Sequence, residues 1–363
     1  MRNRRLLIVD DSAVIRRSLT AAFSAEPGLE VVGSASNGRI ALMKMPLLQP
    51  DVVVLDIEMP DLDGIQTLAV IRQAHPKLPI IVLNVRTPQG AAATIDALTC
   101  GATDYVMKPD APVPSTHALK SLADELVSKV ALWCPGDADD RPMPVPGRTP
   151  AHTPAPVDGP RHAERVDVVA IGISTGGPGA LMDLLPRFAA DFPVPIVIVQ
   201  HMPPIFTKLL AERLAARAKM AVAEGQLADI LGPGGAWIAP GDLHMAVKQD
   251  GKAVRLVTHR LPPENSCRPA VDVLFRSVSE VYGSHVLAVV MTGMGQDGLR
   301  GSAAIRSAGG QVIVQDEASS VVWGMPGYVA RAGLADQVLP LDKLGAEIMG
   351  RVQRHRRTVG AAV

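Results

Sequence analysis

Three polar residues, each following an apolar run, suggest the most specific chemistry in this sequence. Ser174 follows VDVVAIGI, His201 follows PIVIVQ, and Asp297 follows VLAVVMTGMGQ within a glycine-rich turn. A serine hydroxyl is a weak nucleophile until an imidazole takes its proton and a carboxylate orients that imidazole. Because the carboxyl ends of parallel strands meet at one edge of a sheet, we expect these side chains to converge as a catalytic triad.

The loop that carries Ser174, GISTGGPGAL, also invites a nucleotide-binding interpretation. Its glycines at 172, 176 and 177 give G-x-x-x-G-G, which is neither the dinucleotide fingerprint nor a P-loop. Pro178 favours a helix start, where backbone N–H groups attract either a phosphate or a transient oxyanion. Taken singly, a serine cap, a packed histidine and a turn-forming aspartate are simpler explanations; their joint placement favours catalysis.

A second group of polar residues ends the strand-like runs of the first half. Asp10 and Asp11 follow LLIV, Asp56 ends DVVVLD, Asn84 ends PIIVLN, and Lys108 follows TDYVM. Carboxylates that converge in one crevice repel each other unless a hard cation such as Mg²⁺ joins them. The lysine ammonium can then contact a phosphoryl oxygen. Solvated acidic loop entrances are the alternative, which the combination of residues disfavours.

Both halves alternate Val/Ile-rich runs with amphipathic stretches, a pattern that predicts parallel strands in βαβ units. Two alternating runs joined by QDGK, within 241–259, predict a β-hairpin in the second half. The proline-rich segment 134–163 predicts a linker. We therefore expect two doubly wound parallel-sheet α/β domains, at 1–133 and 164–357, the second Rossmann-like with three layers and a hairpin.

Composition excludes several classes of protein. The chain has 36 basic and 36 acidic residues and only 3% aromatic residues, which argues against nucleic-acid binding. Its three cysteines are scattered without a CxxC pair, so spacing suggests neither a disulfide framework nor a zinc site. No signal peptide and no apolar run of membrane-spanning length is recognised. We expect a cytoplasmic monomer without membrane insertion.

Residues 4–130 resemble the receiver domain of two-component response regulators. The resemblance is carried by IVDDS, VLDIEMPDLDGI and GATDYVMKP. It implies a flavodoxin-like fold in which Asp56 accepts a phosphoryl group and Lys108 contacts it. It also implies a Mg²⁺ site formed by Asp10, Asp11, Asp56 and the backbone carbonyl of Glu58.

The same resemblance implies a conformational switch in the first domain. Tyr105 is the expected rotating aromatic, and Asn84 stands where the family usually has serine or threonine. An amide donates a hydrogen bond to phosphate with a reach different from that of a hydroxyl. Phosphorylation is therefore expected, with an altered coupling to the switch.

Residues 166–345 resemble the catalytic domain of bacterial chemotaxis protein-glutamate methylesterases. The matching stretches include GISTGGP, QHMPP, IAPGDLHM, RPAVDVLF, VMTGMGQDG and QDEASSVVWGMP. The resemblance implies that Ser174 is the nucleophile, His201 the general base and acid, and Asp297 its orienting partner. It further implies oxyanion stabilisation by the Met294 backbone amide and the Thr175 side chain.

The two resemblances together imply a phosphorylation-activated serine esterase. It would hydrolyse glutamate methyl esters on methyl-accepting chemotaxis receptors, release methanol and deamidate receptor glutamines, with no cofactor for hydrolysis. A chemotaxis histidine kinase would phosphorylate the receiver, which otherwise covers the Ser174 crevice. The alternative is a response regulator whose second domain is a non-catalytic binding or signalling module. Arg268 is expected either to orient the substrate or anchor the domain, or to form a salt bridge with Asp272 four residues on.

Overall fold

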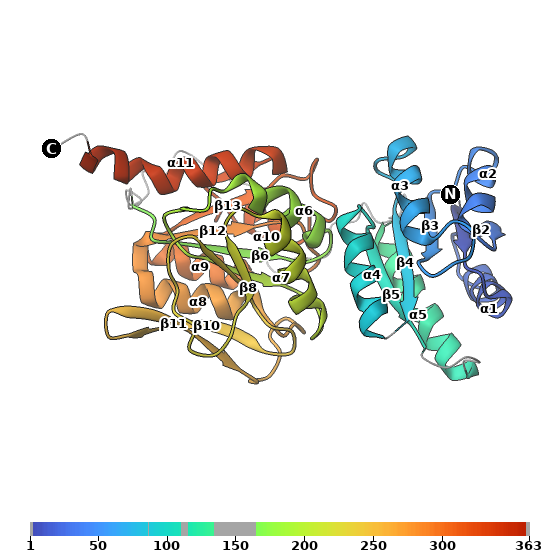
Figure 1. Cartoon of the computed structure of the whole chain (residues 1–363), viewed down its shortest axis with the longest axis horizontal. Helices are drawn as coiled ribbons and strands as arrows, with labels where there is room; N and C mark the ends of the chain where they lie inside the picture. The colour runs from blue at the N-terminus through green and yellow to red at the C-terminus, as the bar shows by residue number, and fades with distance from the viewer. Residues whose placement is uncertain (1–2, 86, 110–114, 134–164, 361–363) are drawn as a thin grey trace, which may run out of the picture. The chain divides into compact units, whose positions relative to one another are not determined.

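The computed structural model describes residues 3–85, 87–109, 115–133 and 165–360. The chain divides into two compact units, residues 1–157 and 158–363, and each is built on its own parallel sheet (Figure 1). The predicted linker at 134–163 lies outside the described residues. Within the described part of the chain, every helix is too short or too polar to cross a membrane.

The first unit alternates strands and helices along the chain. Its strands are β1 (Arg4–Val9), β2 (Leu29–Ala35), β3 (Val52–Asp56), β4 (Ile80–Val85) and β5 (Asp104–Lys108). Its helices are α1 (Ala13–Ser24), α2 (Gly38–Leu48), α3 (Gly64–Ala74), α4 (Pro88–Thr99) and α5 (Thr116–Trp133). The sheet order is β2-β1-β3-β4-β5, with all pairs parallel. The strand order reverses at β1 and β3, which opens a crevice at their carboxyl ends.

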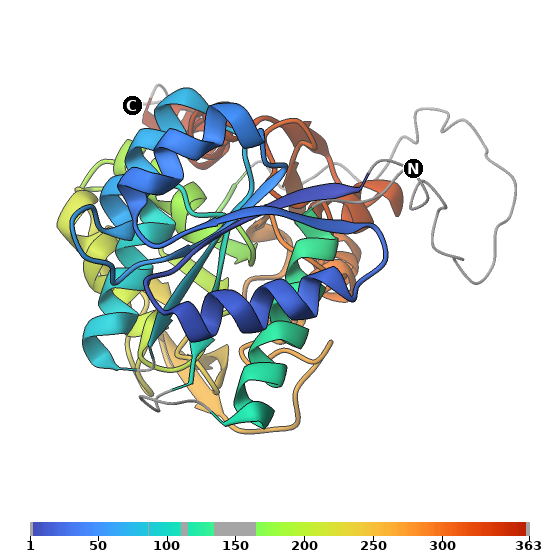
Figure 2. The same ribbon diagram turned by 90° about the vertical axis from the view of Figure 1, so that its right-hand side faces the viewer.

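Local sequence explains how these elements begin and pack. Ser12, Asn37 and Asp63 cap α1, α2 and α3 by accepting a hydrogen bond from a backbone N–H in the first turn. Helices α1 and α5 lie side by side on one face of the sheet (Figure 2). Every residue of β3 is buried, because helices cover both faces of the sheet.

The second unit contains a larger sheet of the same kind. Its strands are β6 (Val168–Ile173), β7 (Ile196–Gln200), β8 (Ala221–Glu224), β9 (Gly235–Ile238), β12 (Val286–Val290), β13 (Gln311–Gln315) and β14 (Gln337–Leu339). Their order is β14-β13-β12-β6-β7-β9-β8, again with all pairs parallel. The connections run in opposite directions on either side of β6, so the crevice of this sheet lies near the ends of β6 and β12.

Helices cover this second sheet on both faces. They are α6 (Gly177–Leu184), α7 (Phe206–Arg217), α8 (Val271–Tyr282), α9 (Leu299–Ser307), α10 (Met325–Arg331) and α11 (Leu341–Gly360), with 3-10 turns at Leu185–Arg187 and Gly283–His285. Helix α8 packs on β6 and on the antiparallel hairpin of β10 (His244–Asp250) and β11 (Ala253–His259). Its buried Leu274, Phe275 and Val278 join the core beneath the sheet.

The predicted fold class, two parallel α/β domains with a hairpin in the second, is confirmed. The apolar runs did not predict the two edge strands of the second sheet, β8 and β14. The four residues of β8 alternate between exposed and less exposed positions, and β14 has only three residues, so neither strand has the continuous apolar run that marked the central strands.

Candidate functional site

The three polar residues predicted as a triad follow neighbouring strands of the second sheet. Ser174 follows β6, His201 follows β7, and Asp297 lies in the loop between β12 and α9. Backbone hydrogen bonds join the loops: the Ser174 N–H donates to the Thr292 carbonyl at 3.0 Å, and the His201 N–H donates to the Ile173 carbonyl at 3.2 Å. The strand order therefore places all three residues at one edge of the sheet.

Glycines allow the loops to approach Ser174 closely. Gly176 has a φ of +77°, in the left-handed region that glycine tolerates. A Cβ at Gly293 would lie 2.8 Å from the Ser174 Cβ, so the loop after β12 packs directly against the serine. Met294, next in that loop, is 50% exposed, and its backbone N–H donates no hydrogen bond within the described residues. Among the described residues, the loop that packs against Ser174 thus offers a backbone N–H without an acceptor.

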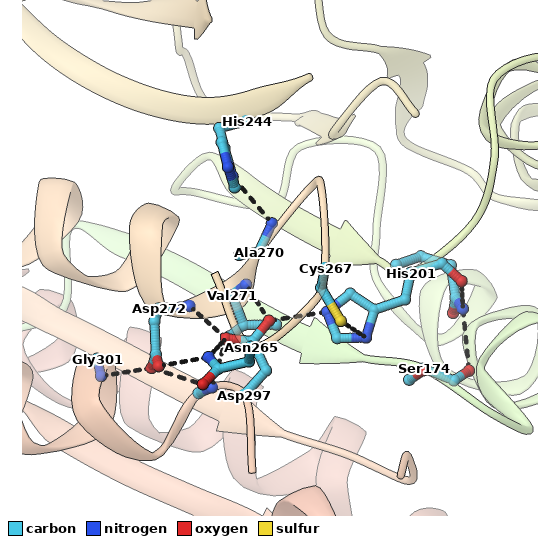
Figure 3. Close-up of polar contacts among 12 residues, drawn as sticks. Ser174, His201, His244, Asn265, Cys267, Ala270, Val271, Asp272, Asp297 and Gly301 are labelled. Atoms are coloured by element: carbon cyan, nitrogen blue, oxygen red, sulfur yellow. Dashed lines mark hydrogen bonds and ion pairs between the residues drawn. The ribbon is translucent and has the colours of Figure 1, made fainter. Parts of the chain in front are cut away.

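His201 is held by the carboxylate of Asp297. The imidazole Nε2 lies 2.8 Å from Asp297 Oδ2, and the His201 side chain is only 13% exposed (Figure 3). Burial alone would lower the pKa of His201. The hydrogen bond to Asp297 and the contact with Cys267 outweigh burial and raise the pKa to about 9. This pair therefore holds the ring in one orientation and favours its protonated form.

Asp297 is saturated with hydrogen bonds. Its two oxygens accept five: from His201, from the backbone N–H groups of Val271, Asp272 and Gly298, and from the Asn265 amide. Two of these donors begin α8, so the carboxylate caps that helix and meets the positive end of its dipole. Burial alone would raise the pKa of Asp297, but these donors hold it below its usual value.

A second buried carboxylate, Asp272, completes the network from the opposite side. Asp272 Oδ1 accepts from the backbone N–H groups of Gly298 at 3.0 Å and Gly301 at 2.7 Å, at the start of α9. Asn265 Nδ2 donates to Asp272 Oδ2 and to Asp297 Oδ1, both at 2.9 Å. Asp297 thus caps α8, the helix that contains Asp272, and Asp272 caps α9, the helix that follows Asp297. Asn265 links the two carboxylates (Figure 3).

The position of Asn265 depends on a tight turn. Glu264 and Cys267 exchange two backbone hydrogen bonds, and the residues between them, Asn265 and Ser266, have φ values of +51° and +61°. Asparagine tolerates this left-handed conformation better than most residues. The turn aims the Asn265 amide at the two carboxylates and leaves the Cys267 side chain beside His201.

The second ring nitrogen of His201 faces Cys267 in this structure. Nδ1 lies 3.7 Å from Cys267 Sγ, and the ring points toward Cys267 and Asp297 in Figure 3. Within the described residues, the Ser174 hydroxyl makes no hydrogen bond to the imidazole. The structure therefore brings together His201 and Asp297 as predicted, and places Ser174 in an adjoining loop without a direct bond to the ring.

Two further residues support the site without having been predicted. Gln200, the buried last residue of β7, donates from Nε2 to the carbonyl of Ser174 at 2.9 Å and to that of His201 at 3.3 Å. Gln200 could have been found in the sequence, because it is a polar residue at the end of the apolar run PIVIVQ. Asn265 had no such signal, because its role depends on a turn remote from Asp297 in the sequence.

Of the alternatives for Arg268, the salt bridge with Asp272 is wrong. Arg268 Nε donates to Asp242 Oδ1 at 2.9 Å, while the oxygens of Asp272 are taken by backbone N–H groups and Asn265. Arg268 and Asp242 line a surface pocket of about 550 Å³ together with His201 and Cys267. A basic side chain therefore borders an open space beside the catalytic candidate His201.

In the first unit, the predicted carboxylate cluster lies at the ends of β1 and β3. The carboxylates of Asp10, Asp11 and Asp56 have ligand oxygens within 4.8 Å of one another. Lys108 Nζ lies 2.8 Å from Asp56 Oδ2 and 3.4 Å from Asp10 Oδ2. The buried Asp56 Oδ1 accepts no hydrogen bond within the described residues. Clustered carboxylates with an unsatisfied oxygen fit a divalent cation such as Mg²⁺.

The pKa of Asp56 in this cluster is shifted in the direction opposite to that of Asp297. Burial, together with the neighbouring charge of Asp10, raises the pKa of Asp56 to about 7 despite the attraction of Lys108. The two carboxylates in turn raise the pKa of Lys108, although its burial acts in the other direction. A bound cation or an added phosphoryl group would change the balance between these attractive and repulsive charges. The pKa values in the cluster are therefore sensitive to both.

The other residues predicted for the first site lie around it. Asn84 is buried, and its amide donates to the Gly90 carbonyl at 2.7 Å and to Thr94 Oγ1 at 3.2 Å, at the start of α4. Tyr105 is half-buried, and Lys129 Nζ lies 5.4 Å from its ring centre. Glu58 is exposed two residues beyond β3. The switch roles of Asn84 and Tyr105, and the carbonyl ligand at Glu58, stay predictions.

Comparisons with known proteins agree on both units. Family models match the response regulator receiver domain over residues 6–119 and CheB methylesterase over residues 169–348. A protein-glutamate methylesterase/protein-glutamine glutaminase of Trichodesmium erythraeum is 50% identical over 96% of this chain and 99% of its own. One from Nocardioides is 46% identical, over 97% and 96%.

A solved structure matches the second unit. The CheB methylesterase catalytic domain of Thermotoga maritima superposes with a TM-score of 0.50 and 41% identity, over 51% of this chain and 97% of that domain. The match covers nearly all of that domain. The candidate triad of this chain thus lies in a unit that is similar to a known catalytic domain.

Proposed function

The chain belongs to the protein-glutamate methylesterase/protein-glutamine glutaminase family, and from this premise we propose that it is a phosphorylation-activated serine esterase. Its substrates are glutamate methyl esters on methyl-accepting chemotaxis receptors, which it hydrolyses with release of methanol. The same acyl chemistry deamidates receptor glutamines to glutamates. The proposal assigns hydrolysis to the second unit, working without a cofactor, and control to the first.

Ser174 attacks the ester carbonyl in the proposed mechanism. His201 takes the serine proton and returns it to the departing methoxide, and water then clears the acyl-enzyme by the same route. Asp297 holds Nε2, so the nitrogen that serves Ser174 is Nδ1, which in this structure faces Cys267. The cycle therefore requires Nδ1 to exchange Cys267 for Ser174 when substrate binds, as catalytic hydrogen bonds often tighten only in the complex.

Oxyanion stabilisation is assigned to two loops, the one after β6 that contains Ser174 and the one after β12 that packs against it. The Met294 N–H is free within the described residues, and Gly293 packs against the serine. Thr175 follows the nucleophile, and its side-chain hydroxyl is the second proposed donor; its backbone is fixed because the Thr175 carbonyl accepts a hydrogen bond from Thr292 Oγ1 at 2.9 Å. One such donor contributes about 3 kcal/mol to the stabilisation of a tetrahedral intermediate.

The first unit receives the signal in this proposal. Asp56 accepts a phosphoryl group from a chemotaxis histidine kinase, and Lys108 contacts that group. The carboxylates of Asp10, Asp11 and Asp56 and the Glu58 carbonyl would hold Mg²⁺. When bound, this ion neutralises negative charge on the carboxylates and phosphoryl oxygens during transfer.

The single observation that carries the catalytic assignment is the saturated carboxylate behind His201. Five hydrogen bonds keep Asp297 ionised in a buried place and aim it at the imidazole Nε2. A turn-forming aspartate of a non-catalytic module has no need of such an arrangement. This favours an esterase over the alternative of a binding module.

Methanol release from methylated receptor membranes tests the proposal. We expect Ser174→Ala to lower the rate at least about 10³-fold, because the remaining groups cannot replace the nucleophile. Ser121→Ala, at an exposed position of α5, is the matched control and should keep the wild-type rate. Equal release by wild type and Ser174→Ala would overturn the assignment.

A further inference from the structure

His201 and Cys267 bring two metal-ligating atoms close together, and one of the two residues, Cys267, has no role in the esterase chemistry just described. Cys267 Sγ is 3.7 Å from His201 Nδ1, although the two residues are 66 positions apart in the sequence. Cys267 is a free, partly exposed cysteine. Together with Asp297, the pair is one of two residue clusters with metal-ligand spacing within the described residues.

The geometry of the pair fits zinc. Zinc binds thiolate sulfur at about 2.3 Å and imidazole nitrogen at about 2.0 Å, so two ligands of a tetrahedral ion lie about 3.5 Å apart. The observed separation of 3.7 Å requires only a small adjustment. A soft thiolate beside an imidazole selects zinc or a similar soft ion rather than the Mg²⁺ suited to the receiver carboxylates.

The surroundings of the pair also resemble those of a metal ligand. His201 Nε2 is held at 2.8 Å by Asp297 Oδ2, the carboxylate–histidine arrangement that orients metal-bound imidazoles. Asp297 is itself fixed by backbone N–H groups and by Asn265, so the ring is fixed before an ion arrives. Both ligand residues line the pocket of about 550 Å³, which gives an ion access and room for water at the remaining coordination positions.

We propose that Cys267 Sγ and His201 Nδ1 form an inhibitory zinc site. Zn²⁺ replaces the proton of the Cys267 thiol and, where the ring is protonated, the proton on His201 Nδ1; these protons leave to solvent, and water completes the coordination. Nδ1 is the nitrogen that must accept the Ser174 proton, so the bound ion removes the general base and stops hydrolysis. The site itself does not depend on the esterase assignment; only its inhibitory consequence rests on the proposed function.

Cobalt spectroscopy of the full chain tests the site independently of activity. Co²⁺ is added under a phosphine reductant, with excess Mg²⁺ present to occupy the receiver carboxylates. We expect a near-ultraviolet thiolate-to-cobalt band at one equivalent, displaced by Zn²⁺. The band should disappear in Cys267→Ser and Cys267→Ala and persist in the matched controls Cys100→Ser and Cys134→Ser. Absence of the band from the wild type, or its persistence without Cys267, would overturn the proposal.

Zinc titrations of methanol release test the consequence. Each variant is compared with its own zinc-free rate, and a chelator should restore activity. We expect Cys267→Ser to need at least about tenfold more Zn²⁺ for half-inhibition than the wild type. Cys100→Ser should match the wild type. Equal sensitivity of wild type and Cys267→Ser would overturn the inhibitory site, whereas a chain without esterase activity in any variant would overturn the proposed function and leave the cobalt spectrum to decide the site.

Discussion

The two units each bury an aspartate at the carboxyl edge of a parallel sheet, Asp56 at the end of β3 and Asp297 after β12. Asp297 accepts five hydrogen bonds, and its pKa is held below the usual value. Asp56 has an oxygen without a hydrogen bond, and its pKa is raised to about 7 by burial and by Asp10.

The difference shows how one fold suits two kinds of chemistry. A carboxylate saturated by backbone N–H groups is a fixed negative charge, able to orient and stabilise an imidazolium. A carboxylate crowded by others, with a free oxygen, is poised to take a cation or to form a bond. The supply of hydrogen-bond donors decides which role a buried aspartate at this edge can perform.

Neutralising each aspartate should separate these roles most strongly. We expect Asp297→Asn to lower kcat/KM for methanol release about 10⁴-fold, because the amide no longer stabilises the imidazolium or its orientation. Asp56→Asn should instead abolish the increase in rate that a small-molecule phosphoryl donor with Mg²⁺ gives. If Asp297→Asn stays within tenfold of the wild type, the contrast between the two carboxylates is mistaken.

The pH dependence of the esterase follows from the same network. His201 acts as a base only when neutral, and its pKa is raised to about 9. We therefore expect kcat/KM to rise about tenfold per pH unit from pH 6 and to level near pH 9. Because the contact with Cys267 helps to raise this pKa, Cys267→Ser should shift the profile to lower pH. A flat profile between pH 7 and 9 would contradict the expectation.

Removing Asn265 should weaken the saturated carboxylate by one donor. We expect Asn265→Ala to lower kcat about tenfold and the free energy of unfolding by about 1–3 kcal/mol, since two buried carboxylates lose an amide. Asn265→Gly is the matched variant, because glycine accepts the left-handed backbone at this position. An intact rate in the glycine variant would assign the effect to the backbone rather than the amide.

The smallest expected effect concerns the stability of the receiver unit. The pKa of Asp56 is raised above its unfolded value, so its burial destabilises the fold as pH rises from about 4 to 7 and remains unfavourable above 7. We expect Asp56→Asn to raise the free energy of unfolding by about 1 kcal/mol or more at pH 8, measured by calorimetry without Mg²⁺. The exposed Asp11→Asn is the control and should change stability less.

Much of the fold could be predicted from residue patterns. Continuous Val/Ile runs give central strands buried on both faces, and these runs marked every central strand of both sheets. The edge strand β8 escaped prediction because it is short and partly exposed. An edge strand forms by pairing with the neighbouring strand. Its own hydrophobic pattern does not reveal that pairing.

The sequence by itself determined which polar residues end the strands, and parallel topology then gathers strand ends at one edge. It therefore indicated Ser174, His201 and Asp297 in one unit and Asp10, Asp56 and Lys108 in the other. Their catalytic and phosphorylation roles remain predictions with the tests given above.

Only the tertiary structure decided what each of these groups contacts. The turn at Glu264–Cys267 brings Asn265 to Asp297 and Cys267 to His201, and it leaves Arg268 with Asp242 rather than Asp272. These contacts join loops remote in sequence and depend on left-handed backbone at two consecutive residues. Such loop geometry decides which atoms come within hydrogen-bonding distance of one another. The hydrophobic periodicity of the local sequence does not specify it.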